Sequence, residues 1–137
     1  MRHLGRKHDL YGKSDLDKAH VDMVYEGARD LQRKFTQARN KGEGDLMQFI
    51  SCGLLIELAI LEGLISSKGN IYVIGEKITF VDYLLWVLLN TFLEQKSDIL
   101  QDFPALNSYY ERIKARPNIN KYLESDEYLY MFEKYNK

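Results

Sequence analysis

The side chains that could do chemistry are few in this sequence and lie far apart. His3, His8 and His20 are not spaced with cysteine or carboxylates as a metal site requires, so we expect no metal. The one cysteine, Cys52, lies among apolar residues in QFISCGLLIEL, which favours a small buried hydrophobe over a reactive thiol. A single cysteine forms no internal disulfide, and this indicates a reducing, cytoplasmic location.

A better-defined pair stands in the stretch GEKITFVDYLLWVLLN, residues 75–90. Thr79 and Asp82 are three residues apart, which predicts a capping box. The Thr79 side chain then accepts from the N–H of residue 82, and the Asp82 carboxylate accepts from the N–H of Thr79. Ile78 and Tyr83 fall at the positions of a hydrophobic staple. The residues that follow are apolar on nearly all sides, so the pair predicts the protected start of a buried central helix and no chemistry.

The elements that position these residues are expected to be helices, because the chain has only two prolines and almost no β-branched alternation. A stripe of small and apolar residues recurs every three or four positions from Ser14 to about Asn40, which predicts a long amphipathic helix capped by Ser14 and Asp17. Its members are Leu16, Ala19, Met23, Gly27, Leu31, Phe35 and Ala38. Further helices are expected from about residue 45 into SSKGN, and in YLLWVLLNTFL, ALNSYYERIKA and NINKYLES. The sequence thus predicts an all-α bundle of about five to six helices.

Composition limits the partners. With 137 residues, 45% of them hydrophobic and 28% charged, the chain fits one globular domain. A formal net charge of −1 gives no general electrostatic case for nucleic acid. The basic cluster of Arg2, Arg6, Lys7 and His8 is local, and a solvated helix end is favoured over a nucleic-acid contact. We therefore expect no nucleic-acid partner.

No membrane partner is expected either. The N-terminus has basic residues with no apolar run after them, unlike a signal peptide. The first of the two most apolar stretches, residues 46–65, is interrupted by Glu57 and Glu62. The second, residues 80–93, is interrupted by Asp82 and Asn90 and is too short to span a bilayer. Both are expected to be core helices.

The motif Gly75-x-x-Ile78-Thr79-x-x-Asp82 resembles the capping box and staple in the helical C-terminal domain of cytosolic glutathione S-transferases. RHLGRKHDLYGK, VDMVYEGARDL, YVIGEKITFVDYLL and FPALNSYYERIKARPNINKYLES resemble their counterparts in order, most closely in the pi class of the alpha, mu, pi and sigma branch. The resemblance is weakest between residues 41 and 69 and in the tail. It implies a remnant of the last thioredoxin-domain helix and linker in residues 1–13, a helical domain in residues 14–127 and a C-terminal tail in residues 128–137.

In that family a thioredoxin-like domain binds glutathione, and a Tyr or Ser hydroxyl there stabilises the thiolate that attacks the electrophile. The helical domain supplies the wall of a hydrophobic electrophile pocket. The resemblance therefore implies glutathione as co-substrate, hydrophobic electrophiles as substrates, no further cofactor, and a homodimer in the full-length form.

The resemblance also implies site residues. By the match of GARDL, Asp30 corresponds to the acid that reaches across the dimer to the γ-glutamyl ammonium of glutathione, from the edge of the buried face. Taken alone, the residues favour a solvated carboxylate or one paired with Arg29 or Arg33. Thr36 and Asn40 match positions that face the electrophile pocket, and Asn40 stands where pi-like enzymes have an aromatic hydroxyl.

No residue of the chain matches the family's catalytic Tyr, because the resemblance begins within the last helix of the thioredoxin-like domain and that domain is absent from this sequence. Whether the chain is an enzyme is therefore left open. One hypothesis is a glutathione transferase represented by its electrophile-site domain and inactive without the other half. The alternatives are a non-catalytic binding or assembly module on the same scaffold, and a truncated product with no function.

Overall fold

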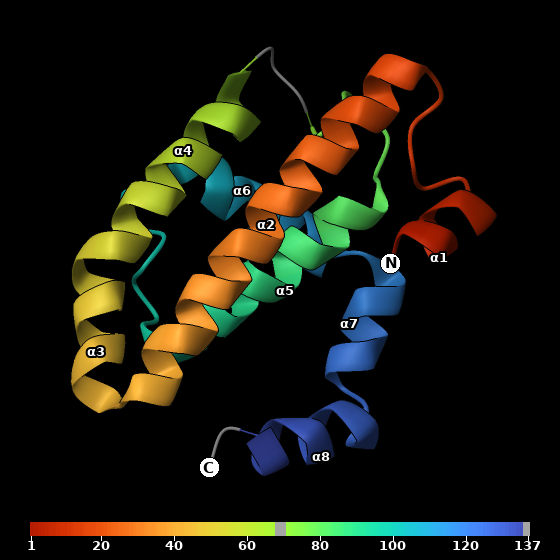
Figure 1. Ribbon diagram of the computed structural model, residues 1–137. Helices are drawn as coiled ribbons and strands as arrows, with labels where there is room; N and C mark the ends of the chain where they lie inside the picture. Colours follow the sequence, from red (N-terminus) through yellow and green to blue (C-terminus); the bar gives the residue numbers. More distant parts are fainter. Residues whose placement is uncertain (68–70, 136–137) are drawn as a thin grey trace.

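The structure, a computed structural model, describes residues 1–67 and 71–135, without the side chains of residues 131–133 and 135. Within those ranges every regular element is helical, and one isolated β-bridge joins Ile74 to Lys77. The predicted all-α bundle is confirmed (Figure 1). The elements in chain order are α1 (Arg2–Lys7), α2 (Asp15–Lys41), α3 (Glu43–Gln48), the π-helical turn η1 (Phe49–Gly53), α4 (Leu54–Ser66), α5 (Phe80–Gln95), α6 (Pro104–Lys114), α7 (Pro117–Leu123) and α8 (Asp126–Tyr135).

Helix α5 is the central rod that the sequence predicts. It packs against α1, α2 and α6 and lies behind α2 in Figure 1. Neighbours on several sides leave little of its surface to water, which explains the missing polar face. Its buried residues are Phe80, Val81, Asp82, Leu84, Leu85, Trp86, Leu88, Leu89 and Phe92.

Helix α2 begins with the predicted cap: the Asp17 N–H donates to Ser14 Oγ at 3.0 Å, and the Ser14 N–H donates to the Asp17 carboxylate at 3.0 Å. The predicted apolar stripe is wrong in its first half, where Leu16 and Met23 are exposed. The core lies about one position further round the helix, because two stripes with the same spacing run along α2 and only one faces α5. The residues that α2 buries are Val21, Val24, Ala28, Leu31 and Phe35.

Helices α3 and α4, joined by the wider turn η1, run back beside α2 (Figure 1). The run Glu43–Ser66 is the one helix in the described part of the chain that is long and apolar enough to cross a membrane, and 22% of its most apolar window is buried. The expectation of a core helix therefore holds for one face only, formed by Ile50, Leu54, Leu58 and Ile65. Cys52 is exposed, so its predicted burial is wrong: it lies on the side of the helix away from that face.

Two of the C-terminal helices begin at the prolines of the sequence. Pro104 and Pro117 stand in the first turns of α6 and α7, where a missing N–H is harmless. The side chain of Glu62 caps α6, accepting from the N–H groups of Ala105 at 2.9 Å and Leu106 at 2.8 Å. The expected C-terminal tail is helical as far as Tyr135, in helix α8, which begins at Asp126. The end of the predicted helix in SSKGN and the end of the tail lie partly outside the described residues.

Candidate functional site

The motif on which the family resemblance rests is a buried polar centre around Asp82, which has 0% of its surface exposed. Its Oδ2 accepts from the Thr79 N–H at 2.6 Å and the Thr79 hydroxyl at 2.7 Å. Its Oδ1 accepts from the Val73 N–H at 2.9 Å and the Tyr109 hydroxyl at 2.8 Å. The predicted capping box between Thr79 and Asp82 is confirmed. The carboxyl group thus joins the loop before α5, the start of α5 and helix α6.

Burial dominates the electrostatics of this centre. It raises the pKa of Asp82, and the hydrogen bonds from Val73, Thr79 and Tyr109 partly oppose that effect. Burial also raises the pKa of Tyr109 well above its ordinary value, and the neighbouring Asp82 raises it further. A hydroxyl that stays protonated serves here as a permanent donor, so the centre is suited to holding elements together rather than to moving protons.

Gly75 sets the turn that leads into this centre. Its φ of 55° lies in the left-handed region that glycine adopts without strain. Its carbonyl accepts from the N–H groups of Ile71 and Tyr72, both at 3.0 Å. Ile78 is partly buried against the core, and its staple with Tyr83 stays a prediction.

The residue assigned to glutathione, Asp30, lies on α2 with 61% of its side chain exposed. The expected place at the edge of the buried face is therefore wrong. Its Oδ1 is 3.1 Å from Arg33 Nη2, so the alternative of a local pair with a neighbouring arginine is the arrangement observed. Because Asp30 and Arg33 are both solvated, this pair is weak and can exchange partners.

Thr36 and Asn40 lie one turn apart on the same side of α2, and both are exposed. The Thr36 hydroxyl donates to the Gln32 carbonyl at 2.9 Å. A shallow groove beside Thr36 is lined by Arg29, Gln32, Arg33, Thr36 and Gln37. The residues that line this groove are polar or charged and include neither Asp30 nor Asn40. This side of α2 therefore carries an open groove that does not join the three predicted residues.

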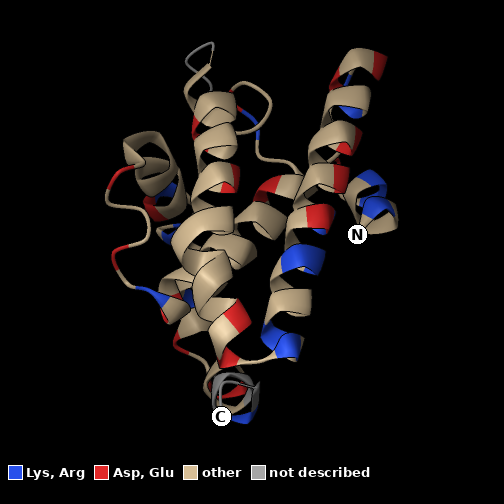
Figure 2. Ribbon diagram, turned by 60° about the vertical axis from the view of Figure 1, so that its left-hand side comes forward, with Lys and Arg blue, Asp and Glu red and all other residues tan. Residues whose placement is uncertain are grey.

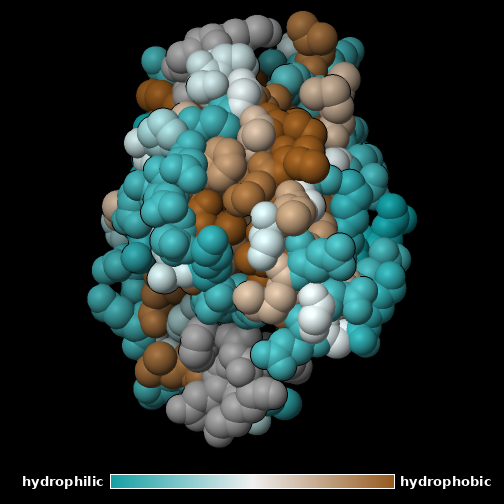
Figure 3. All heavy atoms as spheres, turned by 90° about the vertical axis from the view of Figure 1, so that its left-hand side faces the viewer, coloured by the Kyte–Doolittle hydropathy of each residue, from teal (hydrophilic) through white to brown (hydrophobic). Residues whose placement is uncertain are grey.

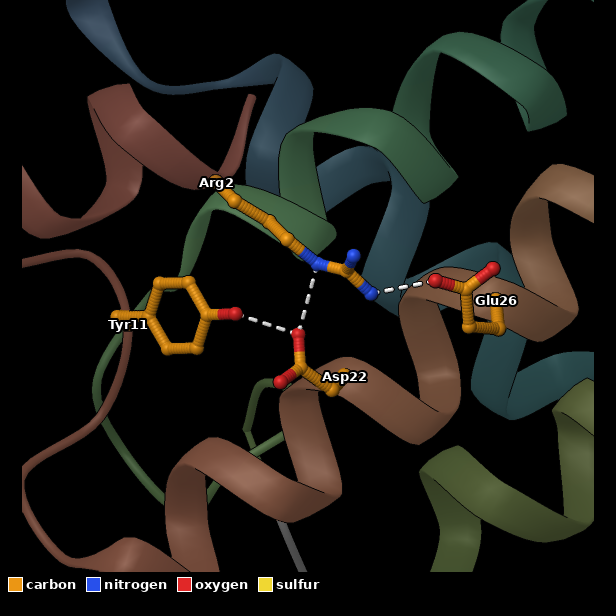
Figure 4. A network of polar contacts seen from close by, with 4 residues as sticks. All are labelled: Arg2, Tyr11, Asp22 and Glu26. Atoms are coloured by element: carbon orange, nitrogen blue, oxygen red, sulfur yellow. Dashed lines mark hydrogen bonds and ion pairs between the residues drawn. The ribbon is translucent and has the colours of Figure 1, made fainter.

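Sequence reasoning missed a polar network that fastens α1 to α2 (Figure 4). Arg2 Nε lies 2.9 Å from Asp22 Oδ1, and the same guanidinium pairs with Glu26. The Tyr11 hydroxyl donates to Asp22 from the linker, and Arg2 also lies over the ring of Tyr25, 4.8 Å from its centroid. No periodicity or local spacing relates these residues, because Arg2 and Asp22 are 20 positions apart.

Apolar packing reinforces the same junction. A Cβ added to Gly5 would lie 2.5 Å from Phe80 Cδ1, so α1 approaches the start of α5 as closely as glycine allows. The Phe80 N–H donates to the Leu10 carbonyl at 2.8 Å. Helix α1 and the linker therefore pack as part of the helical unit.

A second polar cluster stands between α5, α6 and α8. The Tyr110 hydroxyl donates to Asn90 Oδ1 at 2.8 Å, and Asn90 Nδ2 donates to the Tyr128 hydroxyl at 3.3 Å. Tyr110 stacks on Trp86, with ring centroids 5.8 Å apart. Burial raises the pKa of Tyr110 to about 12. Across residues 1–67 and 71–135, no three His, Cys, Asp or Glu side chains gather as metal ligands would.

The fold and the Gly75 to Asp82 motif define the class of protein. Residues 29–126 match the family model described as "Glutathione S-transferase, C-terminal domain". The chain belongs to the glutathione S-transferase family and contains its helical C-terminal domain.

Within the family, its relatives are pi-class enzymes, as the sequence resemblance indicates. Glutathione S-transferase P 10 of Caenorhabditis elegans is 36% identical over 124 residues, which cover 90% of this chain and 59% of the relative. Human glutathione S-transferase P is 35% identical over 135 residues, covering 94% and 62%. The structure of the Onchocerca volvulus pi-class enzyme is similar with a TM-score of 0.82 at 34% identity, covering 90% and 61%. The chain therefore spans less than two thirds of the length of these relatives.

Proposed function

We propose that this chain is the electrophile-site part of a cytoplasmic glutathione transferase, which conjugates glutathione to hydrophobic electrophiles in detoxification and is a homodimer in its full-length form. The observation that carries the proposal is the similarity to the pi-class structure over 90% of this chain. The placement of Thr36 and Asn40 on one exposed side of α2 agrees with a role as one pocket wall. In the sequence resemblance no residue of this chain matches the family's catalytic Tyr, so we propose that turnover requires the thioredoxin-like half.

Asp30 is proposed to bind the γ-glutamyl ammonium of glutathione held by the other subunit. Its carboxylate is exposed and its partner is a solvated arginine three residues away. Such surface pairs contribute about 0–1 kcal/mol, so exchanging Arg33 for an ammonium costs little. A charge-assisted hydrogen bond to the ligand is worth about 1.5–3 kcal/mol. Asp30 therefore gains free energy by leaving Arg33 and binding the γ-glutamyl ammonium, once the thioredoxin-like half holds glutathione in place.

The test is a conjugation assay with a generic aryl halide. The chain alone is expected to give no rate above the uncatalysed reaction. The chain joined to the thioredoxin-like half of a pi-class relative is expected to turn over. Turnover by the chain alone contradicts the need for that half, and a folded joined protein without turnover contradicts the electrophile-site role.

The alternative candidate is a non-catalytic binding or assembly module. The observation that favours it is the exposed apolar surface of α4, where Ile56 and Ile60 have 66% and 64% of their surface exposed. If the chain is such a module, it is expected to bind a partner or itself even when the joined protein shows no conjugation activity. The two candidates are thus separated by measuring activity and association on the same sample.

A further inference from the structure

The open groove on the C-terminal half of α2 is built entirely from the side chains of that helix. Its lining consists of Arg29, Gln32, Arg33, Thr36 and Gln37, all polar or charged. These positions recur at helical spacing, so they share one face of α2. The groove has a volume of about 300 Å³, at the lower end of the range for small-molecule sites. It therefore has room for one small ligand.

Two arginines give this groove its charge. Arg29 and Arg33 are one turn apart on the same face, so both guanidinium groups can reach the same anion. Arg29 Nη1 donates to Gln32 Oε1 at 2.7 Å, and this neutral partner leaves the charge of Arg29 in place. Arg33 pairs with Asp30 at 3.1 Å, but the pair is exposed and therefore weak. The chemistry of the groove thus favours an anionic ligand.

The positive charge of α2 is confined to a short segment. Figure 2 shows most of the Lys and Arg residues of α2 in its C-terminal half and most of its Asp and Glu residues in the other half. Lys34 pairs with Glu57 of α4, so its charge is neutralised. The whole chain has a net charge of −1. A long polyanion such as nucleic acid would meet the acidic half of α2 as well, whereas a short anion contacts the groove alone.

A separate exposed apolar surface lies on α4, where Ile56 and Ile60 are exposed. Figure 3 views the side on which α3 and α4 lie and shows a hydrophobic band bordered by hydrophilic surface. An uncharged aromatic compound is expected to prefer that band, because its binding is driven by apolar contact. Charge is therefore the property by which the groove of α2 selects its ligand.

We propose that this groove binds a carboxylate group carried by the electrophile, with Arg29 and Arg33 as specificity-determining residues. The proposal rests on the proposed function, in which Thr36, a member of the groove, faces the electrophile. It deepens that function by naming the substrate class, which is aromatic electrophiles with an anionic substituent. The carboxylate anchors the substrate and takes no part in making or breaking bonds.

The geometry of the guanidinium group suits this ligand. Its fork of N–H donors matches the two oxygens of a carboxylate and can form two parallel hydrogen bonds with it. In the proposed function Asp30 leaves Arg33 to bind the γ-glutamyl ammonium of glutathione. Arg33 is then free to bind the substrate, so glutathione prepares the groove for the carboxylate.

The first test uses the chain alone with an unreactive probe. Dinitrobenzoate is titrated into the isotope-labelled chain and compared by nuclear magnetic resonance with dinitrobenzene, which has the same ring without the carboxylate. The amide signals of residues 29–37 are expected to shift with dinitrobenzoate and not with dinitrobenzene. Arg29→Gln and Arg33→Gln are each expected to weaken the binding about fivefold or more.

The matched control for this titration is Arg39→Gln. It removes the same charge from the same helix, at an exposed residue that lies about 100° round α2 from the midpoint of Arg29 and Arg33. It is expected to change the affinity by less than about twofold. Circular dichroism checks that the variants fold. The absence of shifts at residues 29–37, or an equal loss of affinity in Arg39→Gln, overturns the proposal.

The second test measures substrate preference in the protein joined to the thioredoxin-like half. The substrates are chlorodinitrobenzoate and its methyl ester, which has the same ring without the charge. With both, the glutathione thiolate forms a C–S bond to the ring carbon, the C–Cl bond breaks, and chloride leaves with the bonding electrons. The kcat/KM, divided by the uncatalysed rate constant, is expected to favour the carboxylate about tenfold, mainly through KM. Arg29→Gln and Arg33→Gln are expected to abolish this preference, and Arg39→Gln to keep it.

The outcomes separate this proposal from the transferase function. Turnover of the ester without preference for the carboxylate overturns the proposal and leaves the transferase function intact. Turnover of neither substrate by the folded joined protein contradicts the transferase function and overturns the substrate assignment with it. The two failures are distinguishable, because only in the second is the ester inert.

Discussion

Replacing Asp82 by Asn tests whether the buried centre holds the bundle together. The change keeps the shape and one acceptor oxygen, which can still serve Val73 and Tyr109. It puts an NH₂ group where Oδ2 accepts from the N–H and the hydroxyl of Thr79. The Thr79 N–H then loses its acceptor, whereas the Thr79 hydroxyl can turn and accept from the new NH₂ group. We therefore expect a loss of about 1–3 kcal/mol in the free energy of unfolding. That is a large share of the stability of a small domain.

The assay is urea unfolding followed by circular dichroism, with Asp102→Asn as control because Asp102 is exposed. The control is expected to change the free energy of unfolding by less than about 0.5 kcal/mol. The pH dependence adds a second readout. Since burial raises the pKa of Asp82, folding favours its protonated form. The free energy of unfolding is therefore expected to be highest below the ordinary pKa of the carboxyl group and to fall as pH rises through the raised value, and Asp82→Asn is expected to lack this pH dependence. A loss below about 1 kcal/mol in Asp82→Asn would refute the claim that the four hydrogen bonds to the Asp82 carboxylate stabilise the fold.

Three further outcomes are expected from contacts elsewhere in the fold. Gly5→Ala brings a Cβ against the Phe80 ring and is expected to cost about 1–3 kcal/mol in urea unfolding, and an unchanged midpoint would contradict the close approach of α1 and α5. Glu62→Gln removes the charge that caps α6 and is expected to lower the free energy of unfolding by about 1–2 kcal/mol in the same measurement. An unchanged free energy of unfolding would show that water satisfies the N–H groups of α6 equally well. Tyr110→Phe is expected to remove one phenol that titrates at about 12 in the ultraviolet difference spectrum. Because that pKa is raised by folding, the stability Tyr110 contributes is lost as pH rises from 10 towards 12, and a phenol titrating at its ordinary value would contradict its burial.

Local chemistry in this fold is predictable from the sequence. The pairs Ser14 with Asp17 and Thr79 with Asp82 form their caps because the partners are three residues apart and the helix itself sets their geometry. Proline likewise marks the starts of α6 and α7. These interactions depend on no other part of the chain.

Contacts between residues far apart in the sequence, and the choice of which helix face is buried, could not be predicted from the sequence. The Tyr109 hydroxyl reaches Asp82 from 27 residues away, and no local pattern indicates that contact. Periodicity also cannot choose between two stripes with the same spacing on α2, so Met23 was expected inside and is exposed. Cys52 illustrates the same limit, because apolar neighbours in sequence predict burial only when another element covers that side of the helix.

The candidate site depends on the family resemblance more than on residue patterns. Asp30, Thr36 and Asn40 are assigned by their match to the family's motif, and the structure places all three on the surface of α2. Neither burial nor hydrogen bonding within this chain marks them as functional. In the proposed function, the partner of Asp30 is glutathione, and that of Thr36 and Asn40 is the electrophile.

The glutathione affinity of the joined protein tests the central claim most directly. Calorimetric titration compares the unchanged protein with Asp30→Asn and with Asp98→Asn, an exposed acid paired with Lys96 at 3.8 Å. A charge-assisted bond of about 1.5–3 kcal/mol corresponds to a dissociation constant raised roughly 10- to 150-fold in Asp30→Asn. The Asp98→Asn protein is expected to bind as the unchanged protein does. Equal affinities in all three proteins would contradict the assignment of Asp30 to the glutathione site.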